Sequence, residues 1–360
     1  MRAVRSRVGS AVAASLVAAS ALEFTVRLDD WAQFGVPLAA PAVSMAELAV
    51  RDSLGFHARA GVHFRQYRIN RWGFRGDDVD PRSGRGPLVF AAGASETFGL
   101  YESPGRDWPQ QLQDSLSQCA GPVRVLNAAF AGMSLPTVRQ DFVRRLQPHA
   151  PTVWVYYPTP MQYLTTPLPT PAEPLPGAIP PLSPWRSRAL PRFRDAIKRG
   201  IPEPLLDLGR TLMTARARKA DAITARTTVD QDRLDAFERD LRALVGTVRG
   251  AGTTPVLVVH ANRFADTTSA DARRMLTAWE RFYPEFTGTA IVRFDAAAAE
   301  RTRTVAADSG IMLVDPRPRL RTLGTSAFRD FGHFNDSGAA AVAGETARAV
   351  SPLVCRSSAR

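Results

Sequence analysis

The chain has 360 residues, 45% of them hydrophobic, which suits one large domain with additions or two small domains. Its formal net charge is +12, carried almost entirely by arginine, since Lys198 and Lys219 are the only lysines. No basic patch interleaved with aromatic residues and no nucleic-acid-binding motif accompanies this charge, so a nucleic-acid partner is not expected. Attraction to an anionic membrane surface or to an acidic polysaccharide is compatible with it.

The N-terminus, residues 1–27, has the pattern of an export signal. Three arginines among the first seven residues precede Val8–Leu22, an uncharged run of 15 residues rich in Ala, Val and Leu. Ala19–Ala21 offers a cleavage site. A helix that continues through Glu23 to Arg27 would instead leave a membrane anchor, although the run is shorter than the roughly 20 residues of a spanning helix. Both alternatives place the folded part outside the cytoplasm. An ordinary buried helix is the remaining alternative.

Residues 28–84 form an N-terminal prefix without clear periodicity. Tyr67–Gly76 is its most distinctive part. No chemistry follows from its residue types, so we interpret it as a structural lead-in that packs against the following domain. His57 and His63 also lie in the prefix. Two histidines six residues apart, without a third ligand, indicate packing or surface residues rather than a metal site.

Five short apolar runs predict the strands of a sheet, and helical patterns separate them. The clearest helix is predicted over Asp232–Val248, where apolar residues recur on one face. Alternating strands and helices are typical of a parallel α/β sheet, in which the polar groups that follow the strands meet at the carboxyl edge. The predicted strands are Leu88–Ala92, Val123–Asn127, Val153–Tyr157, Pro255–His260 and Ile311–Asp315.

An insertion, residues 164–228, interrupts this alternation and divides the α/β part into residues 85–163 and 229–355. Leu164–Pro191 contains nine prolines, too many for a helix or a central strand. Phe193–Ala222 is basic and is predicted to be helical. Two interpretations stay open. The insertion is either a lid or acceptor-binding surface over a site, or a solvated linker followed by a packing helix.

A serine and an aspartate–histidine pair stand at points where a site is expected. Ser95 follows the run Leu88–Ala92 and two small residues, so its hydroxyl lies either in a site at the carboxyl edge or at an ordinary helix N-cap. Near the C-terminus, Asp330 and His333 share one loop before an Ala-rich helical run. A serine nucleophile needs a base, and the base needs an orienting carboxylate, so these three residues form a candidate triad.

The sequence segments around these three residues resemble conserved sequence blocks of the SGNH/GDSL hydrolase superfamily. Gly93–Gly99 resembles its first block, Val125–Gly132 its second, and Asp330 with His333 its last, over roughly residues 85–353. The resemblance implies a three-layer, flavodoxin-like α/β fold with a five-stranded parallel sheet flanked by helices.

The resemblance also implies a role for each site residue. Ser95 would attack an ester carbonyl, His333 would take the serine proton and return it to the leaving alcohol, and Asp330 would orient His333. The N–H groups of Ser95 and Gly132 would hold the oxyanion.

Two residues depart from the family's pattern. Ala94 stands where the family has an aspartate that supports the site without belonging to the triad. Met161 stands where the third block has an oxyanion-binding asparagine, and a thioether donates no hydrogen bond. Loss of one such donor costs about a hundredfold in rate or more. Gln162, or Asn262 after the fourth strand, could supply the missing donor. Asn262 or His260 could also line the pocket, and the alternative for both is that they cap the following turn.

Cys119 and Cys355 are the only cysteines. In the flavodoxin-like order the first and last helices lie on the same face of the sheet, and each cysteine falls near the end of one of them. An oxidising compartment permits a bridge, so we expect a disulfide between them.

The sequence therefore predicts an exported serine esterase or O-acyltransferase, periplasmic or at the cell surface. The resemblance suggests an ester, in particular an O-acetyl ester, of a carbohydrate or envelope polymer. The alternative that Met161 favours is a catalytically weak or inactive glycan-binding module of the cell envelope. An envelope scaffold that uses the proline-rich segment is a third. No cofactor and no metal are expected, because the sequence shows no nucleotide or metal motif. The expected partners are an ester-bearing small molecule or polysaccharide and, if the N-terminal segment is uncleaved, a membrane.

Overall fold

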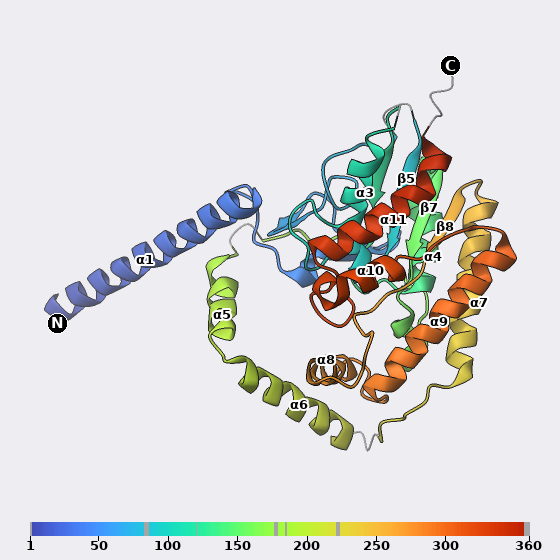
Figure 1. Ribbon diagram of the computed structural model, residues 1–360. Coiled ribbons are helices and arrows are strands. Elements are labelled where there is room, and N and C mark those ends of the chain that lie inside the picture. The colour runs from blue at the N-terminus through green and yellow to red at the C-terminus, as the bar shows by residue number, and fades with distance from the viewer. Residues whose placement is uncertain are drawn as a thin grey trace.

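A computed structural model describes residues 2–82, 86–119, 121–175, 179–183, 186–220 and 224–355. Arg85 and residues 221–222, which belong to predicted elements, lie outside the described residues. At the centre is a fully parallel sheet of five strands in the order β6-β5-β7-β8-β9 (Figure 1). This is the flavodoxin-like order, and each predicted strand is present within two residues of its predicted ends. The strands are β5 (Leu88–Gly93), β6 (Arg124–Asn127), β7 (Val153–Tyr157), β8 (Thr254–Val258) and β9 (Met312–Val314).

The sheet is buried on both faces, which explains why its strands are continuous apolar runs rather than alternating ones. On β7, Val153, Val155 and Tyr157 pack into one core, and Trp154 and Tyr156 pack into the other. The predicted helix over Asp232–Val248 is confirmed as part of α7. One face is covered by α3 (Trp108–Leu116), α10 (Arg317–Leu323) and α11 (Asp336–Val354), and the other by α4 (Leu135–Asp141), α7 (Gln231–Gly250) and α9 (Gly288–Ser309) (Figure 1). The helix α8 (Ala270–Glu280) packs on α9 beyond the end of the sheet (Figure 1).

The prefix packs against the α/β domain through two small hairpins and the segment that follows them. Phe74 is fully buried in the core beside the sheet, and the backbone N–H of Arg75 donates to the carbonyl of Asn127 at the end of β6 (3.0 Å). The buried Arg75 guanidinium also pairs with Asp107 (3.4 Å). This part of the chain is therefore the structural lead-in that the sequence predicts. The hairpin strands are β1 (Ala49–Asp52) with β2 (Gly55–Ala58), and β3 (His63–Phe64) with β4 (Tyr67–Arg68).

His57 is a packing residue of the β1–β2 hairpin. Its ring is buried, Nδ1 lies 2.9 Å from the carbonyl oxygen of Ala58, and Nε2 lies 3.2 Å from the Asp52 carboxylate. Both ring nitrogens therefore have partners within the hairpin.

The N-terminal helix α1 (Arg2–Phe34) is continuous and projects from the body of the molecule (Figure 1). Its apolar side chains are largely exposed, among them Val12, Leu16 and Val17. The interpretation as an ordinary buried helix is therefore wrong. Within the described residues, no helix combines the length and the hydropathy needed to cross a membrane.

The insertion's helices begin at a contact with α1. The Glu23 carboxylate accepts hydrogen bonds from the Ser187 hydroxyl (2.7 Å) and from the backbone N–H of Arg188 (2.9 Å). These bonds hold the start of α5 (Ala189–Arg199), and α6 (Glu203–Ala220) follows it. The chain thus enters α5 beside the exposed helix α1 and not beside the sheet.

The proline-rich part of the insertion packs on the prefix. The backbone N–H of Leu175 donates to the carbonyl of Asp52 (3.1 Å), and the Arg59 guanidinium donates to the carbonyl of Pro180 (2.9 Å). Leu182 packs against the core beside them. This segment is therefore held against the domain at several points, which a freely solvated linker would not be.

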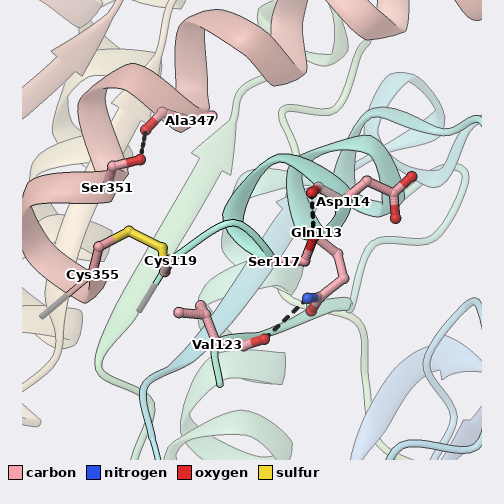
Figure 2. Close-up of a disulfide and its surroundings, with 8 residues drawn as sticks. All are labelled: Gln113, Asp114, Ser117, Cys119, Val123, Ala347, Ser351 and Cys355. Atoms are coloured by element: carbon pink, nitrogen blue, oxygen red, sulfur yellow. Dashed lines mark hydrogen bonds between the residues drawn. A yellow bond between two sulfur atoms is a disulfide. The ribbon is translucent and has the colours of Figure 1, made fainter. Parts of the chain in front are cut away.

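Cys119 and Cys355 form the expected disulfide (Figure 2). Cys119 follows α3, and Cys355 follows α11, and these two helices pack side by side on one face of the sheet. Because α3 runs back from the carboxyl edge of the sheet, the disulfide lies at the amino edge. It therefore joins the first and last helices of the fold at the end opposite Ser95.

Candidate active site

Ser95 stands at a sharp turn after the central strand β5. Gly93 is the last residue of this strand, and a Cβ there would lie 2.8 Å from the carbonyl oxygen of Tyr157 and closer still to Thr97. Only glycine fits this approach. The short helix α2 (Ser95–Phe98) then begins, with Ala94 at its N-cap position. The N-cap interpretation of Ser95 is therefore wrong, and its side chain is available for other contacts.

The candidate triad is assembled. His333 Nε2 lies 2.9 Å from Ser95 Oγ, and His333 Nδ1 lies 2.8 Å from Asp330 Oδ2. Asp330 Oδ1 also accepts the backbone N–H groups of Gly332 (3.0 Å) and His333 (2.9 Å). These two bonds fix the carboxylate on its own loop, so it can hold the imidazole toward Ser95. Ser95 and His333 are 238 positions apart in the sequence, and the topology of the sheet brings them together.

The pKa shifts of the pair follow from their contact. Burial by itself would raise the pKa of Asp330, but the hydrogen bond and charge of His333 hold it below the ordinary value. Burial would lower the pKa of His333, but the hydrogen bond to Asp330 and the negative charges of Glu96 and Asp330 raise it above the ordinary value. The arrangement therefore stabilises an imidazolium at His333, the species formed when a base takes a serine proton.

A second buried network lies behind the triad, and the sequence analysis missed it. His260 Nδ1 lies 2.6 Å from Asp295 Oδ1, and His260 Nε2 lies 3.9 Å from Glu96 Oε1. All three side chains are buried. Burial would lower the pKa of His260, but Asp295 and Glu96 raise it to about 10. Burial would raise the pKa of Glu96, but His260 and His333 lower it to about 2. A buried cation therefore lies between two carboxylates, one of them adjacent to Ser95.

Gly132, Met161 and Gln162 line one cavity with Ser95. Gly132 adopts a positive φ of 87°, which explains why the second block ends in glycine. Met161 is 2% exposed and occupies the third-block position without a hydrogen-bond donor. Gln162 also lines the cavity, but its side-chain N–H donates to the carbonyl of Met133 (3.0 Å). One of the two Gln162 amide hydrogens is thus already bound.

Asn262 does not supply the missing donor, so that prediction is wrong. Its side-chain N–H donates to Asp295 Oδ2 (2.6 Å), and its carbonyl accepts the backbone N–H of Phe264 (2.8 Å). Asn262 lines a different cavity from Ser95. The alternative interpretation, a turn cap, holds for Asn262. It fails for His260, whose ring is instead buried against Asp295.

The cavity that opens over Ser95 has a volume of about 710 Å³. Its wall is aromatic and cationic: Trp279 stacks on Phe331 with 5.1 Å between ring centroids, and Arg281 and Arg329 line the same cavity. Tyr101 packs edge-on against His333 at 5.4 Å. None of the described residues of the insertion lines this cavity, but α6 contacts α8, which carries the cavity residue Trp279.

Comparison with known proteins gives structural similarity at low sequence identity. No protein-family model matches the chain, and no curated protein matches it significantly. The chain is similar to an acetylxylan esterase from Geobacillus stearothermophilus, at 13% identity and a TM-score of 0.42, over 76% of this chain and 95% of the esterase. It is also similar to a lipase/acylhydrolase from Enterococcus faecalis, at 12% identity and a TM-score of 0.44, over 76% of this chain and 100% of the other.

The strand order and the placement of the side chains agree with what the resemblance to the SGNH/GDSL hydrolase superfamily implies. The sheet is parallel and flavodoxin-like, and Ser95, His333 and Asp330 are in hydrogen-bond contact in that order. The fold is therefore a flavodoxin-like three-layer α/β fold, and Ser95, His333 and Asp330 have the mutual contacts of a serine–histidine–aspartate triad.

Proposed function

We propose that this protein is a serine esterase or O-acyltransferase of the SGNH type. The single observation that carries the proposal is the continuous hydrogen-bonded chain Ser95–His333–Asp330 at the mouth of a cavity. Nucleophile, base and orienting carboxylate are within the 2.6–3.2 Å that proton transfer requires.

In the proposed reaction, Ser95 Oγ attacks the carbonyl carbon of an ester while His333 Nε2 takes the hydroxyl proton. Asp330 stabilises the imidazolium, and the N–H groups of Ser95 and Gly132 hold the oxyanion. The tetrahedral intermediate collapses, and His333 returns the proton to the departing alcohol, which leaves an acyl-serine. Water then attacks the acyl-serine in an esterase, or a second alcohol attacks it in an acyltransferase. His333 takes the proton of the attacking group and returns it to Ser95.

The proposed substrate is an O-acylated carbohydrate, with an O-acetyl group as the simplest acyl donor. Support comes from the cavity wall, where Phe282 and Phe331 present ring surfaces on which sugar rings can pack, while the buried Trp279 stacks behind Phe331. Arg281 and Arg329 beside them favour a substrate that carries negative charge. An acidic envelope polysaccharide bearing O-acetyl esters has both properties.

We propose that the folded part is extracytoplasmic. The Arg-rich start followed by the uncharged run Val8–Leu22 supports export, and the Cys119–Cys355 disulfide suits an oxidising compartment. Cell fractionation tests this location: recovery in the periplasmic, envelope or secreted fraction agrees with the proposal, and recovery in the cytoplasm contradicts it.

A second candidate, a catalytically weak glycan-binding module, is favoured by one observation. The third-block position holds Met161, which has no donor, and Gln162 beside it already donates to Met133. In that case the cavity would bind a glycan, and turnover would be slow or absent.

Turnover of p-nitrophenyl acetate by the full chain separates the two candidates. Ser95→Ala and His333→Ala are each expected to lower kcat/KM by at least about a thousandfold, because either change removes the activated nucleophile. Ser115→Ala is the matched control, since the Ser115 hydroxyl donates to the Gln111 carbonyl on α3 and has no contact with the site. Equal background rates in all four proteins, together with glycan binding, would favour the second candidate.

A further inference from the structure

Glu96 lies immediately after Ser95 and is 6% exposed. Its Oε2 lies 3.2 Å from Ser95 Oγ and accepts the Thr159 hydroxyl (3.0 Å). Its Oε1 faces the buried His260 at 3.9 Å. The two oxygens of one carboxylate thus connect the nucleophile with a buried imidazolium that Asp295 holds from the other side.

The Glu96 carboxylate is a second acceptor for the single hydroxyl hydrogen of Ser95. Ser95 Oγ carries one hydrogen but lies within reach of two acceptors, His333 Nε2 at 2.9 Å and Glu96 Oε2 at 3.2 Å. When His333 is neutral, the serine hydrogen points to Nε2, and the Glu96 carboxylate then faces the serine oxygen with no hydrogen between them. When His333 is protonated, its Nε2–H donates to Oγ and the serine hydrogen turns to Glu96. Only this second arrangement satisfies both contacts.

We propose that Glu96 is a positioning residue that competes with His333 for the hydrogen of Ser95. At low pH it holds the hydroxyl turned away from the base, and the nucleophile is ready only after His333 loses its proton. Glu96 thereby sets the pH at which the site becomes active. Its effect on turnover rests on the function proposed above, whereas its effect on the protonation of His333 does not.

Replacement of Glu96 by glutamine reverses the preference. A carboxamide that keeps its oxygen toward His260 presents its N–H₂ to Ser95 Oγ. The serine oxygen then accepts from the amide while its own hydrogen points to neutral His333. The neutral state of His333 gains a hydrogen bond, and the protonated state loses both a bond and a nearby negative charge.

Other titratable groups face Ser95, Glu96 and His333 from each surrounding element, but they do not alter this comparison. Four tyrosines have a pKa above the ordinary value of 10, because burial raises it, and stay neutral: Tyr101, Tyr156, Tyr157 and Tyr283. The other groups are Asp330, His260, Asp295, Arg281 and Arg329, together with Glu102, whose pKa burial raises to about 7. Of all these groups, only Glu96 and His333 are hydrogen bonded to the Ser95 hydroxyl. The pKa of His333, raised by Asp330 and then by Glu96, agrees with the proposal.

The test is an NMR titration of the His333 imidazole in the full chain. The chain has five histidines, so His333 is assigned by the signal that His333→Asn removes. The proposal expects Glu96→Gln to lower the pKa of His333 by about one unit, the effect of losing one nearby opposite charge. An unchanged or higher pKa in Glu96→Gln would overturn the proposal.

Glu102→Gln is the control for loss of charge, because Glu102 is a second buried carboxylate that acts on His333 by charge alone. Burial raises the pKa of Glu102 to about 7, so the comparison is made on the part of the His333 titration above pH 7, where Glu102 is mostly ionised. Glu102→Gln should shift the pKa of His333 by less than half as much as Glu96→Gln does. An equal shift would mean that any nearby charge suffices, and would overturn the specific role of Glu96. If Glu96→Gln does not fold, the double variant Glu96→Gln/His260→Gln removes the buried anion and cation together. A lower His333 pKa is again the supporting result, and no change overturns the proposal.

Turnover gives a second readout. The acid limb of kcat/KM for p-nitrophenyl acetate should move to lower pH in Glu96→Gln by the same amount as the NMR pKa. An acid limb that stays in place while the NMR pKa falls would overturn the link between Glu96 and activity. If wild type and Ser95→Ala turn over substrate equally, the proposed function fails, while the titration still decides the role of Glu96.

Discussion

Removal of the Cys119–Cys355 disulfide should destabilise the fold without changing its chemistry. The bridge closes a loop of 236 residues, and the chain-entropy relation gives about 5 kcal/mol for a loop of that length. Because α3 and α11 already pack through buried side chains such as Leu116 and Val350, the native geometry does not depend on the bridge. We expect Cys119→Ser/Cys355→Ser to lower the free energy of unfolding by about 3–5 kcal/mol.

Urea unfolding followed by circular dichroism under oxidising conditions measures this change. Each single serine variant should lose as much stability as the double variant, since either one opens the loop. The esterase rate per folded molecule should stay that of the wild type, because the bridge lies at the edge of the sheet opposite Ser95. A loss below 1 kcal/mol in the double variant would refute the reasoning.

Three further predictions concern the site and its surroundings. Gly93→Ala should lower both soluble yield and turnover at least tenfold, because the new Cβ collides with Thr97 and with the Tyr157 carbonyl; a normal melting temperature and rate would contradict this close approach. Met161→Asn should raise kcat for p-nitrophenyl acetate about tenfold or more, because it adds a side-chain donor at a cavity position that has none, and an unchanged kcat with intact fold would show that the backbone donors suffice. Burial raises the pKa of Glu102 from 4.5 to about 7, so the folded protein binds this proton more tightly than the unfolded chain does. The contribution of this proton to the free energy of unfolding is full below pH 4.5 and is lost as the pH rises through 7. Glu102→Gln should therefore be more stable than wild type at pH 8, by about 3 kcal/mol in urea unfolding, with a difference that shrinks toward pH 4.5; a pH-independent difference would contradict the shift.

The sheet could be predicted from the sequence because its strands are buried on both faces. A run such as Leu88–Gly93 has no exposed side, so it stands out as continuous apolar residues without any knowledge of its neighbours. The prefix hairpins gave no such signal. Their strands are two to four residues long, which is too short for an alternation of buried and exposed residues to be recognised.

The triad could be predicted because its members stand in short local patterns. Ser95 follows a strand, and Asp330 and His333 share one loop, so each block is recognisable before the fold is known. The network behind the triad could not be found in this way. Asp295 lies on α9 and contacts His260 35 residues away, and nothing near Asp295 in the sequence marks it as functional. The one sequence signal for this network was Glu96, the only charged residue in the segment Leu88–Gly99, directly after Ser95.

Asn262 shows the opposite error. Its position after β8 put it at the correct edge of the sheet, but strand position does not determine where a side chain points. The hydrogen bonds to Asp295 and Phe264 orient the Asn262 side chain toward a neighbouring cavity. Local side-chain to backbone bonds of this kind compete with functional roles for asparagine.

The most direct test of the central claim is covalent labelling of the nucleophile. A fluorophosphonate reacts with a serine whose hydroxyl is activated by a base, and peptide mass spectrometry of the full chain locates the adduct. We expect one phosphonylated residue, Ser95, with labelling abolished in Ser95→Ala and slowed at least a hundredfold in His333→Ala. An unlabelled Ser95 in the folded wild-type protein, or equal labelling in His333→Ala, would contradict the claim that Ser95, His333 and Asp330 act as a triad.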